Sequence, residues 1–230
     1  ADGVKALLVN SELADAKYVY YYLRSVNIAH AGYSRHFKFL KEKKIPIPTD
    51  KDTPNINDQK CIAHLLGKVD GLIAQRKQHL LQLDDLLKSM FLEMFGDPVR
   101  NDMGWDKPEL TFFGKVSTGN TPPRKDQSNY SAKYVEWVKT DNISSDYVFV
   151  SRATEYLSEI GSGKGRTVTK GALLVACIAG SLESIGRSAL TDRTVAFNQQ
   201  INAIQPNNEV NPYYLYVLFK ISKSYIQNHA

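Results

Sequence analysis

Apolar positions follow the most regular pattern of the chain between residues 57 and 94. They recur at alternating spacings of three and four, which is typical of one face of a long coiled-coil helix. Only Arg76 interrupts this face. The helix is therefore predicted to carry an apolar seam made of Ile62, Leu66, Val69, Ile73, Leu80, Leu83, Leu87, Met90 and Met94.

Both ends of this helix are marked in the sequence. Asn55 followed by Asp58 is typical of a helix start, and Gly96 followed by Pro98 is typical of a helix end. At about 1.5 Å per residue, the helix extends roughly 57 Å, which is too long for so small a protein to cover. We therefore predict a coiled-coil spacer that pairs with another long helix, with an ordinary core helix as the alternative.

The residues before the helix form a segment of mixed character. A strand-like run at residues 6–9 is followed by an aromatic segment at 18–23 and by a basic stretch that ends in Ile-Pro-Ile-Pro at 45–48. Proline fixes φ and forces the residue before it into extended geometry, so residues 45–48 are predicted to be extended rather than helical. The aromatic side chains are expected to pack in a core, although unpaired bases can also stack on such rings.

After Pro98 the chain changes to short β-like runs between Gly, Pro, Ser and Asn residues. A final aromatic segment at residues 212–225 has helical character. The fold class expected is α+β: a mixed, mostly-β domain plus one long helix that forms an antiparallel coiled coil. The expected strands are 134–138, 147–150, 173–178, 189–191 and 201–204.

An internal repeat links the two ends of the chain. Residues 15–24 align with residues 211–220, so that Asn211 follows Asp15 by 196 positions, and residues 6–10 align with 203–207 after a one-residue slip. The repeat predicts the end of one structural unit, its long helix and most of a second unit. Chance similarity between two amphipathic aromatic helices is the alternative.

Composition and charge leave a nucleic-acid partner open. The net charge of +5 permits a polyanionic partner, because Lys and Arg displace counterions from nucleic acid. No stretch approaches the roughly 20 apolar residues that span a bilayer, so no membrane contact and a cytoplasmic location are expected. Cys61 and Cys177 lie far apart without a Cys/His cluster, so no metal site and no cofactor are expected.

The search for catalytic motifs gives no candidate. The sequence has no His-Glu-x-x-His, no nucleophile elbow and no glycine-rich cofactor loop. The run at 161–166 departs from the phosphate-loop pattern, because Ser158 replaces the first glycine and Gly165 follows Lys164 in place of Ser or Thr. The chain is therefore not expected to be an enzyme, although scattered carboxylates leave an unrecognised nuclease as an alternative.

Three stretches together resemble the specificity subunit of type I restriction-modification systems. The first joins residues 45–48 to the helix that ends at 94–98, the second is Gly-Asn-Thr-Pro at 119–122 followed by 135–143, and the third comprises 170–174, 185–187 and 197–200. The resemblance covers nearly the whole chain. It depends on the order and spacing of the three stretches, because each is unspecific alone.

The resemblance implies a non-catalytic subunit that recognises DNA sequence. In this family, two target-recognition domains alternate with two long conserved helices, and the subunit docks methyltransferase and restriction subunits onto a bipartite site in double-stranded DNA. The expected domains are 1–50, the end of a first target-recognition domain; 51–98, the spacer helix; and 99–230, a second domain truncated at its C-terminus. A coiled-coil adaptor without nucleic-acid binding is the alternative.

The chain supplies only one long helix where the family has two. A second copy is the simplest partner of equal length, so we expect an antiparallel homodimer through residues 57–94. Its two recognition surfaces would be related by a twofold axis and would read an inverted-repeat site.

Candidate DNA contacts are the polar and basic residues that lie next to predicted strands and turns. Ordinary polar turns, capped turns and solvated charge runs use the same residue types, so both interpretations stay open for each group. Residues 161–166 are expected to form a flexible basic loop, with an inert hairpin as the alternative. The candidates are Arg35, His36, Asn120, Thr121, Arg124, Lys125, Lys139, Thr140, Asn142, Lys164, Arg166, Ser184, Arg187 and Gln199.

Overall fold

The structure is a computed structural model that describes residues 6–27, 37–178 and 180–229. Residue contacts divide the chain into two compact units, residues 1–84 and 85–230. The long helix α3 (Ile56–Phe95) begins in the first unit and ends in the second.

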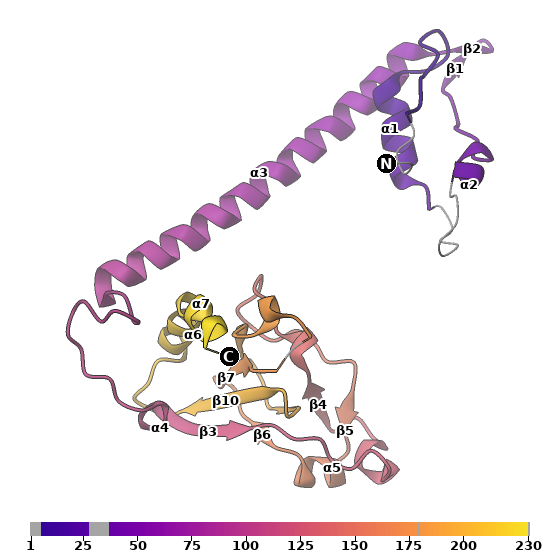
Figure 1. Ribbon diagram of the computed structural model, residues 1–230. Helices are drawn as coiled ribbons and strands as arrows, with labels where there is room; N and C mark the ends of the chain where they lie inside the picture. The colour runs from indigo at the N-terminus through magenta and orange to yellow at the C-terminus, as the bar shows by residue number, and fades with distance from the viewer. Residues whose placement is uncertain (1–5, 28–36, 179, 230) are drawn as a thin grey trace. The chain divides into compact units, whose positions relative to one another are not determined.

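Helix α3 is a single continuous helix of 40 residues (Figure 1). It begins where Asn55 Oδ1 accepts a hydrogen bond from the Asp58 amide at 3.0 Å. It ends at Gly96, whose φ of 73° places it in the left-handed region that favours glycine. The predicted long helix is confirmed, and its predicted ends are each within one residue of the observed ones.

The first unit packs helix α1 (Ala16–Ser25) against the N-terminal part of α3. Gln59 of α3 is completely buried, and its Oε1 accepts from the Asp15 amide at 2.8 Å while its Nε2 donates to Leu13 O at 3.3 Å. The other elements are α2 (Phe37–Lys41) and a hairpin of β1 (Thr49–Asp50) and β2 (Thr53–Pro54). The expected strand at residues 6–9 has no regular structure, and in the described part of this unit no strand pairs with it.

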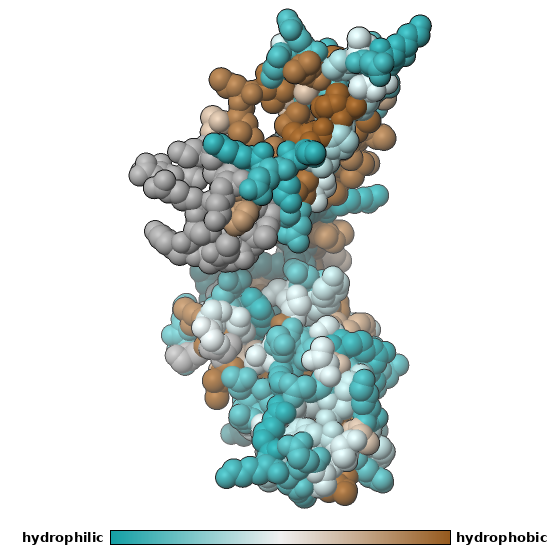
Figure 2. Space-filling view, turned by 90° about the vertical axis from the view of Figure 1, so that its right-hand side faces the viewer, coloured by the Kyte–Doolittle hydropathy of each residue, from teal (hydrophilic) through white to brown (hydrophobic). Residues whose placement is uncertain are grey.

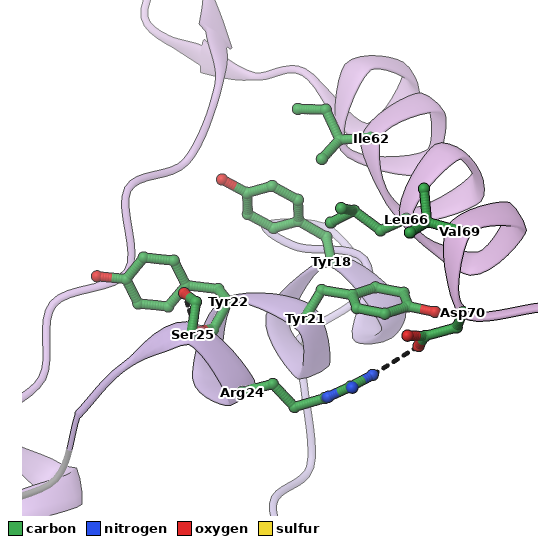
Figure 3. A pocket seen from close by; sticks show the side chains of 9 residues that line it. All are labelled: Tyr18, Tyr21, Tyr22, Arg24, Ser25, Ile62, Leu66, Val69 and Asp70. Atoms are coloured by element: carbon green, nitrogen blue, oxygen red, sulfur yellow. Dashed lines mark hydrogen bonds and ion pairs between the residues drawn. The ribbon is translucent and has the colours of Figure 1, made fainter. Parts of the chain in front are cut away.

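Aromatic side chains of α1 face α3 across a pocket of about 440 Å³ (Figure 3). Tyr18 and Tyr21 line it from α1, with Leu66 opposite on α3. Arg24 Nη1 donates to Asp70 Oδ2 at 2.5 Å at the rim. Tyr18 also donates its hydroxyl to Pro46 O at 2.7 Å, which holds residues 45–48 against α1. These contacts support packing of the aromatic segment rather than base stacking.

The second unit contains two four-stranded sheets. The first sheet is antiparallel, in the order β3 (Gly114–Thr118), β10 (Ile201–Pro206), β7 (Leu173–Ala176) and β8 (Ser188–Leu190). The second has the order β5 (Tyr156–Leu157), β4 (Val135–Val138), β9 (Val195–Phe197) and β6 (Thr167–Val168). Only the β4–β9 pair of that sheet is parallel. The expected α+β class, with a mostly-β domain and one long helix, is confirmed.

Buried aliphatic side chains fill the core of this unit. Leu174 and Ile201 of the first sheet share one cluster with Val138 and Phe197 of the second. On the other face of the first sheet, Leu215 packs from helix α6 (Pro212–Ile221). The remaining elements are α4 (Leu110–Phe113), α5 (Glu159–Lys164), α7 (Lys223–Asn228), η1 (Gln127–Tyr130), η2 (Thr140–Asn142) and η3 (Leu182–Ser184).

Two expectations about local structure are wrong. Residues 147–150 form no strand, because Phe149 makes only an isolated bridge to Leu190. The chain then leaves β8, and the Ser151 amide donates to Asn142 O at 3.1 Å. Residues 161–164 belong to helix α5 rather than to a flexible loop, because Ser158 caps that helix by accepting from the Gly161 amide. The helical character expected for residues 212–225 is confirmed, although the segment forms two helices, α6 and α7, that meet at Ser222.

The two ends of the proposed repeat have matching structures. Helices α1 and α6 begin and end at positions that differ by 196, and each is capped by the side chain of the residue before it, Asp15 or Asn211. Val19 and Leu215, which are equivalent under this shift, are both buried. The match supports a true repeat over chance similarity.

In the described part of the chain, no helix is both long and apolar enough to cross a membrane.

Candidate nucleic-acid interface

Backbone hydrogen bonds hold the loop 119–126 to both sheets, at β10 of the first and at β9 of the second. The Gly119 amide donates to Ile201 O at 3.0 Å, and the Asn120 amide donates to Phe197 O at 3.1 Å. A Cβ atom at Gly119 would lie 2.2 Å from the carbonyl oxygen of Asn198. Glycine is therefore required here, because the loop runs directly against the chain after β9.

The same loop gathers predicted contact residues from three segments. Asn120 Nδ2 donates to Lys164 O at 2.8 Å and its Oδ1 accepts from the Arg166 amide at 2.7 Å. Thr121 donates its hydroxyl to the side-chain oxygen of Gln199. Loop 119–126, the end of α5 and the turn after β9 thus form one surface, on which Asn120, Thr121, Lys164, Arg166 and Gln199 lie together.

An ion pair stiffens this surface. Lys164 Nζ lies 2.9 Å from Asp126 Oδ2. Hydrogen bonds from the Ser128 hydroxyl and from Lys164 lower the pKa of Asp126 to about 2. The carboxylate is therefore charged at neutral pH and holds α5 to the loop.

Arg124 is the central cation of the loop. Its Cζ lies 4.8 Å from the centre of the Tyr130 ring and 4.6 Å from that of Trp137. Arg124 Nη2 donates to Glu155 Oε2 at 2.7 Å. Lys139 pairs with the other oxygen of Glu155, and the hydrogen bond from Lys139 is the main cause of the lowered pKa of that carboxyl.

The residues that follow β4 take part in a turn. Asn142 Oδ1 accepts from the Lys139 amide at 3.0 Å, and Asn142 Nδ2 donates to Ser151 Oγ and to Arg152 O. Thr140 begins the 3-10 helix η2. The Asn142 amide group therefore stabilises the turn, as the alternative interpretation expects, while Lys139 joins the Arg124 cluster.

Ser184 and Arg187 lie on a separate loop at η3. Gln227 of α7 holds this loop, because its Nε2 lies 2.8 Å from Leu182 O and 3.1 Å from Ile185 O. Among the described residues, no hydrogen bond or ion pair joins this loop to loop 119–126. Ser184 and Arg187 are therefore not brought into the same cluster.

The remaining candidates divide into two groups. Lys125 is exposed on loop 119–126, whereas Arg35 and His36 lie outside the described residues.

On α3 the seam residues are at least one-third exposed, with Leu87 the least exposed at 36% and Leu80 the most at 65%. The apolar seam is thus available to a partner in the isolated chain.

Sequence reasoning missed the residues that hold Arg124 and Lys139. Glu155 receives both cations, and Tyr130 and Trp137 provide the rings. The alternation at 135–139 does place Trp137 and Lys139 on one side of a strand. Glu155, however, comes beside them through the pairing of β4 with β5, where the Trp137 amide donates to Glu155 O at 2.9 Å.

This end of the second unit is mainly hydrophilic on the face turned to the viewer in Figure 2, where β5 and α5 lie. Its cations and amides offer donors to phosphate and base edges, so the surface is suited to binding a polyanion.

Among the described residues, no group of three or more His, Cys, Asp or Glu side chains is arranged to hold a metal ion.

Two specificity subunits match half of the chain at low identity. The specificity subunit of the type I restriction enzyme HindI from Haemophilus influenzae is 28% identical over 119 residues, or 51% of this chain and 25% of that protein. The MjaIX specificity subunit from Methanocaldococcus jannaschii is 27% identical over 119 residues, or 50% of this chain and 26% of that protein. The matched region thus spans about a quarter of the length of these relatives.

Solved structures share the fold. The S subunit of a type I restriction-modification system from M. genitalium has a TM-score of 0.51 at 15% identity, over 95% of this chain and 56% of that one. A chain from a structure of type I restriction-modification complex assembly has a TM-score of 0.50 at 14% identity, over 95% of this chain and 55% of that one. The family model for the type I restriction modification DNA specificity domain matches residues 103–230, more than half of the chain. This chain therefore belongs to the type I restriction modification DNA specificity domain family.

Proposed function

We propose that this chain recognises DNA sequence for a type I restriction-modification complex and catalyses no reaction itself. The observation that carries the proposal is the surface formed by loop 119–126, the end of α5 and the turn after β9. It presents donors of the two kinds that DNA requires: cations for phosphates, and amides and hydroxyls for base edges.

The rigidity of this surface favours specific recognition over general attraction. Asn120 and Asp126 each connect the loop to α5, at contacts of 2.7–2.9 Å. Side chains that are already oriented lose less conformational entropy when they bind. Arg166, Lys125 and Gln199 are exposed on this support and are the residues that we expect to face the DNA.

A salt titration tests the function. The affinity of the chain for a random-sequence duplex pool is measured by fluorescence anisotropy at increasing salt. We expect the logarithm of the binding constant to fall linearly with the logarithm of salt concentration. Replacing Lys125 and Arg166 together by Ala should reduce the slope by about 1 for each phosphate that the variant no longer neutralises.

The matched control is Lys115→Ala, which removes one exposed cation from β3 in the other sheet. This control should retain the slope of the unchanged chain. Weak binding at every salt concentration would contradict DNA recognition and favour the coiled-coil adaptor.

The domain assignment and partners form the second part of the proposal. Residues 1–50 would end one target-recognition domain, 51–98 would form the spacer and 99–230 the second domain. The exposed seam on α3 supports contact with methyltransferase and restriction subunits or with a second copy. The assembled complex would bind a bipartite DNA site in the cytoplasm of a bacterium or archaeon.

An antiparallel homodimer through residues 57–94 is the arrangement that we favour for the isolated chain. A helix of 40 residues with an exposed apolar seam needs a partner of equal length, and a second copy has one. Two recognition surfaces related by a twofold axis would read an inverted-repeat site.

A further inference from the structure

A pocket of about 500 Å³ opens beside loop 119–126. Arg124 and Lys133 contribute cations to its wall, Thr154 a hydroxyl, and Tyr130 and Tyr156 aromatic rings. Glu155 is the only carboxylate among the described residues that line it. No motif in the sequence points to this pocket, and of these six residues only Arg124 is a candidate DNA contact by sequence.

Both cations rest on aromatic rings. Lys133 Nζ lies 5.1 Å from the centre of the Tyr156 ring, and Arg124 Cζ contacts the rings of Tyr130 and Trp137. Such contacts restrict long side chains without neutralising them. The two positive charges are therefore oriented before any ligand binds.

Glu155 orients Arg124 and leaves half of its guanidinium group available. A guanidinium group has two edges with two parallel N–H donors each. Glu155 Oε2 accepts from Nη2 at 2.7 Å, which occupies one of these edges. The other edge retains two donors, the arrangement that matches two oxygens of a phosphate group. The side chain is 53% exposed, so solvent and ligands reach it.

We propose that this pocket binds one backbone phosphate of the DNA, with Arg124 and Lys133 as its ligands and Glu155 as the residue that positions Arg124. The inference rests on the proposed DNA-binding function. Thr154 adds a hydroxyl donor, and Lys139, which shares Glu155 with Arg124, adds further positive charge nearby.

Access explains why the ligand is a phosphate rather than a base. Arg124 lines a recess, and two rings and Glu155 hold its guanidinium group there, so the half-exposed side chain is not free to extend towards a groove. Base edges lie at the floor of a major groove about 8.5 Å deep, where only a projecting side chain reaches them. Phosphates protrude from the duplex and can enter a recess.

Three variants test the site by salt titration against the random-sequence duplex pool. Arg124→Ala and Lys133→Ala should each weaken binding at low salt by about tenfold or less and make the salt slope shallower by up to about 1. Arg124→Lys keeps the charge but loses the paired donors, so it should retain the slope and still bind more weakly. Lys115→Ala serves again as the control, and thermal unfolding confirms that each variant is folded.

Glu155→Gln separates positioning from charge. Removal of a carboxylate near DNA raises affinity if the carboxylate acts only through its charge. If Glu155 positions Arg124, affinity falls although the protein has become more positive, and this fall is our expectation. An affinity that rises or stays unchanged overturns the positioning role.

Selection from the random duplex pool decides between phosphate and base. The Arg124→Ala variant should select the same sequences as the unchanged chain, whereas loss of preference at one base pair would show a base contact and overturn the phosphate site. An unchanged slope in both Arg124→Ala and Lys133→Ala, with salt-dependent binding by the unchanged chain, overturns this site alone. Failure of the unchanged chain to bind DNA overturns the proposed function as well.

Discussion

Arg193 holds Glu136 through two parallel hydrogen bonds in the second unit. Arg193 Nε donates to Glu136 Oε1 at 2.9 Å, and Nη2 donates to Oε2 at 2.5 Å. The Ala153 amide and Arg152 also donate to this carboxylate, at 2.9 and 2.8 Å. Because only 10% of the Glu136 side chain is exposed, this cluster ties the segments around 152 and 193 to β4.

Glu136 should make the stability of the chain depend on pH in the acid range. Partial burial favours the neutral carboxyl, but the hydrogen bonds from Arg193, the Ala153 amide and Arg152 outweigh it and lower the pKa of Glu136 from 4.5 to about 2. The unfolded chain therefore takes up this proton first. The stabilisation is complete above about pH 4.5 and is lost as pH falls towards 2.

Glu136→Gln should remove on the order of 3 kcal/mol of unfolding free energy at neutral pH and reduce its decline between pH 4.5 and 2. Urea unfolding at a series of pH values measures both effects. Asp126, whose pKa is also about 2, retains part of the slope. The exposed Glu209→Gln is the control, and an unaltered acid slope in Glu136→Gln would refute the assignment.

Two glycines of α5 should respond in opposite ways to alanine. A Cβ at Gly161 would lie 2.1 Å from Asn129 O, so the variant must push α5 away from η1 and lose about 2 kcal/mol or more of stability. At Gly163 a Cβ would meet nothing within 4 Å, and alanine is favoured in helices by up to about 1 kcal/mol. Thermal unfolding compares them, and equal melting temperatures would contradict this packing.

Gln59→Leu should loosen α1 from α3 in the first unit. The change keeps the size of the side chain but leaves the Asp15 amide without its acceptor, at a cost of about 1–3 kcal/mol. Hydrogen exchange of the amides in residues 16–25 should become faster. The control is Lys60→Leu on the exposed side of α3, and slow exchange retained in Gln59→Leu would disprove the role of this contact.

Aspartate at both Leu80 and Leu83 should abolish association through α3. Both side chains are more than half exposed in the single chain, so the change should not reduce the stability of the monomer. In the proposed homodimer it would bury two charges in an apolar contact on each copy. Light scattering should give a mass near 25.9 kDa for this variant and near twice that value for the unchanged chain.

Gln78→Asp with Gln82→Asp is the matched control, because these positions lie away from the seam on the same helix. It should remain dimeric. A monomeric unchanged chain would reject the homodimer, and cross-links between equivalent ends of α3 would reject only the antiparallel direction.

The sequence was sufficient for features that depend on local periodicity and capping. The seam between residues 57 and 94, with Asn55 before it and Gly96 after it, placed α3 to within one residue at each end. The repeat between residues 15–24 and 211–220 placed two helices of equal length. Such patterns can be recognised from the sequence alone, because each helical residue interacts mainly with neighbours three or four positions away.

The tertiary structure decided which polar residues share a surface and what each of them bonds. Phe149 has strand-like neighbours, but β8 offers it one bridge only, and residues 161–164 become helix because Ser158 accepts from the Gly161 amide. Glu155 lies 31 positions after Arg124 in the sequence, and the pairing of β4 with β5 contributes to bringing the two side chains together. Strand register and loop closure depend on contacts between distant residues, so no local pattern contains the partner of Arg124.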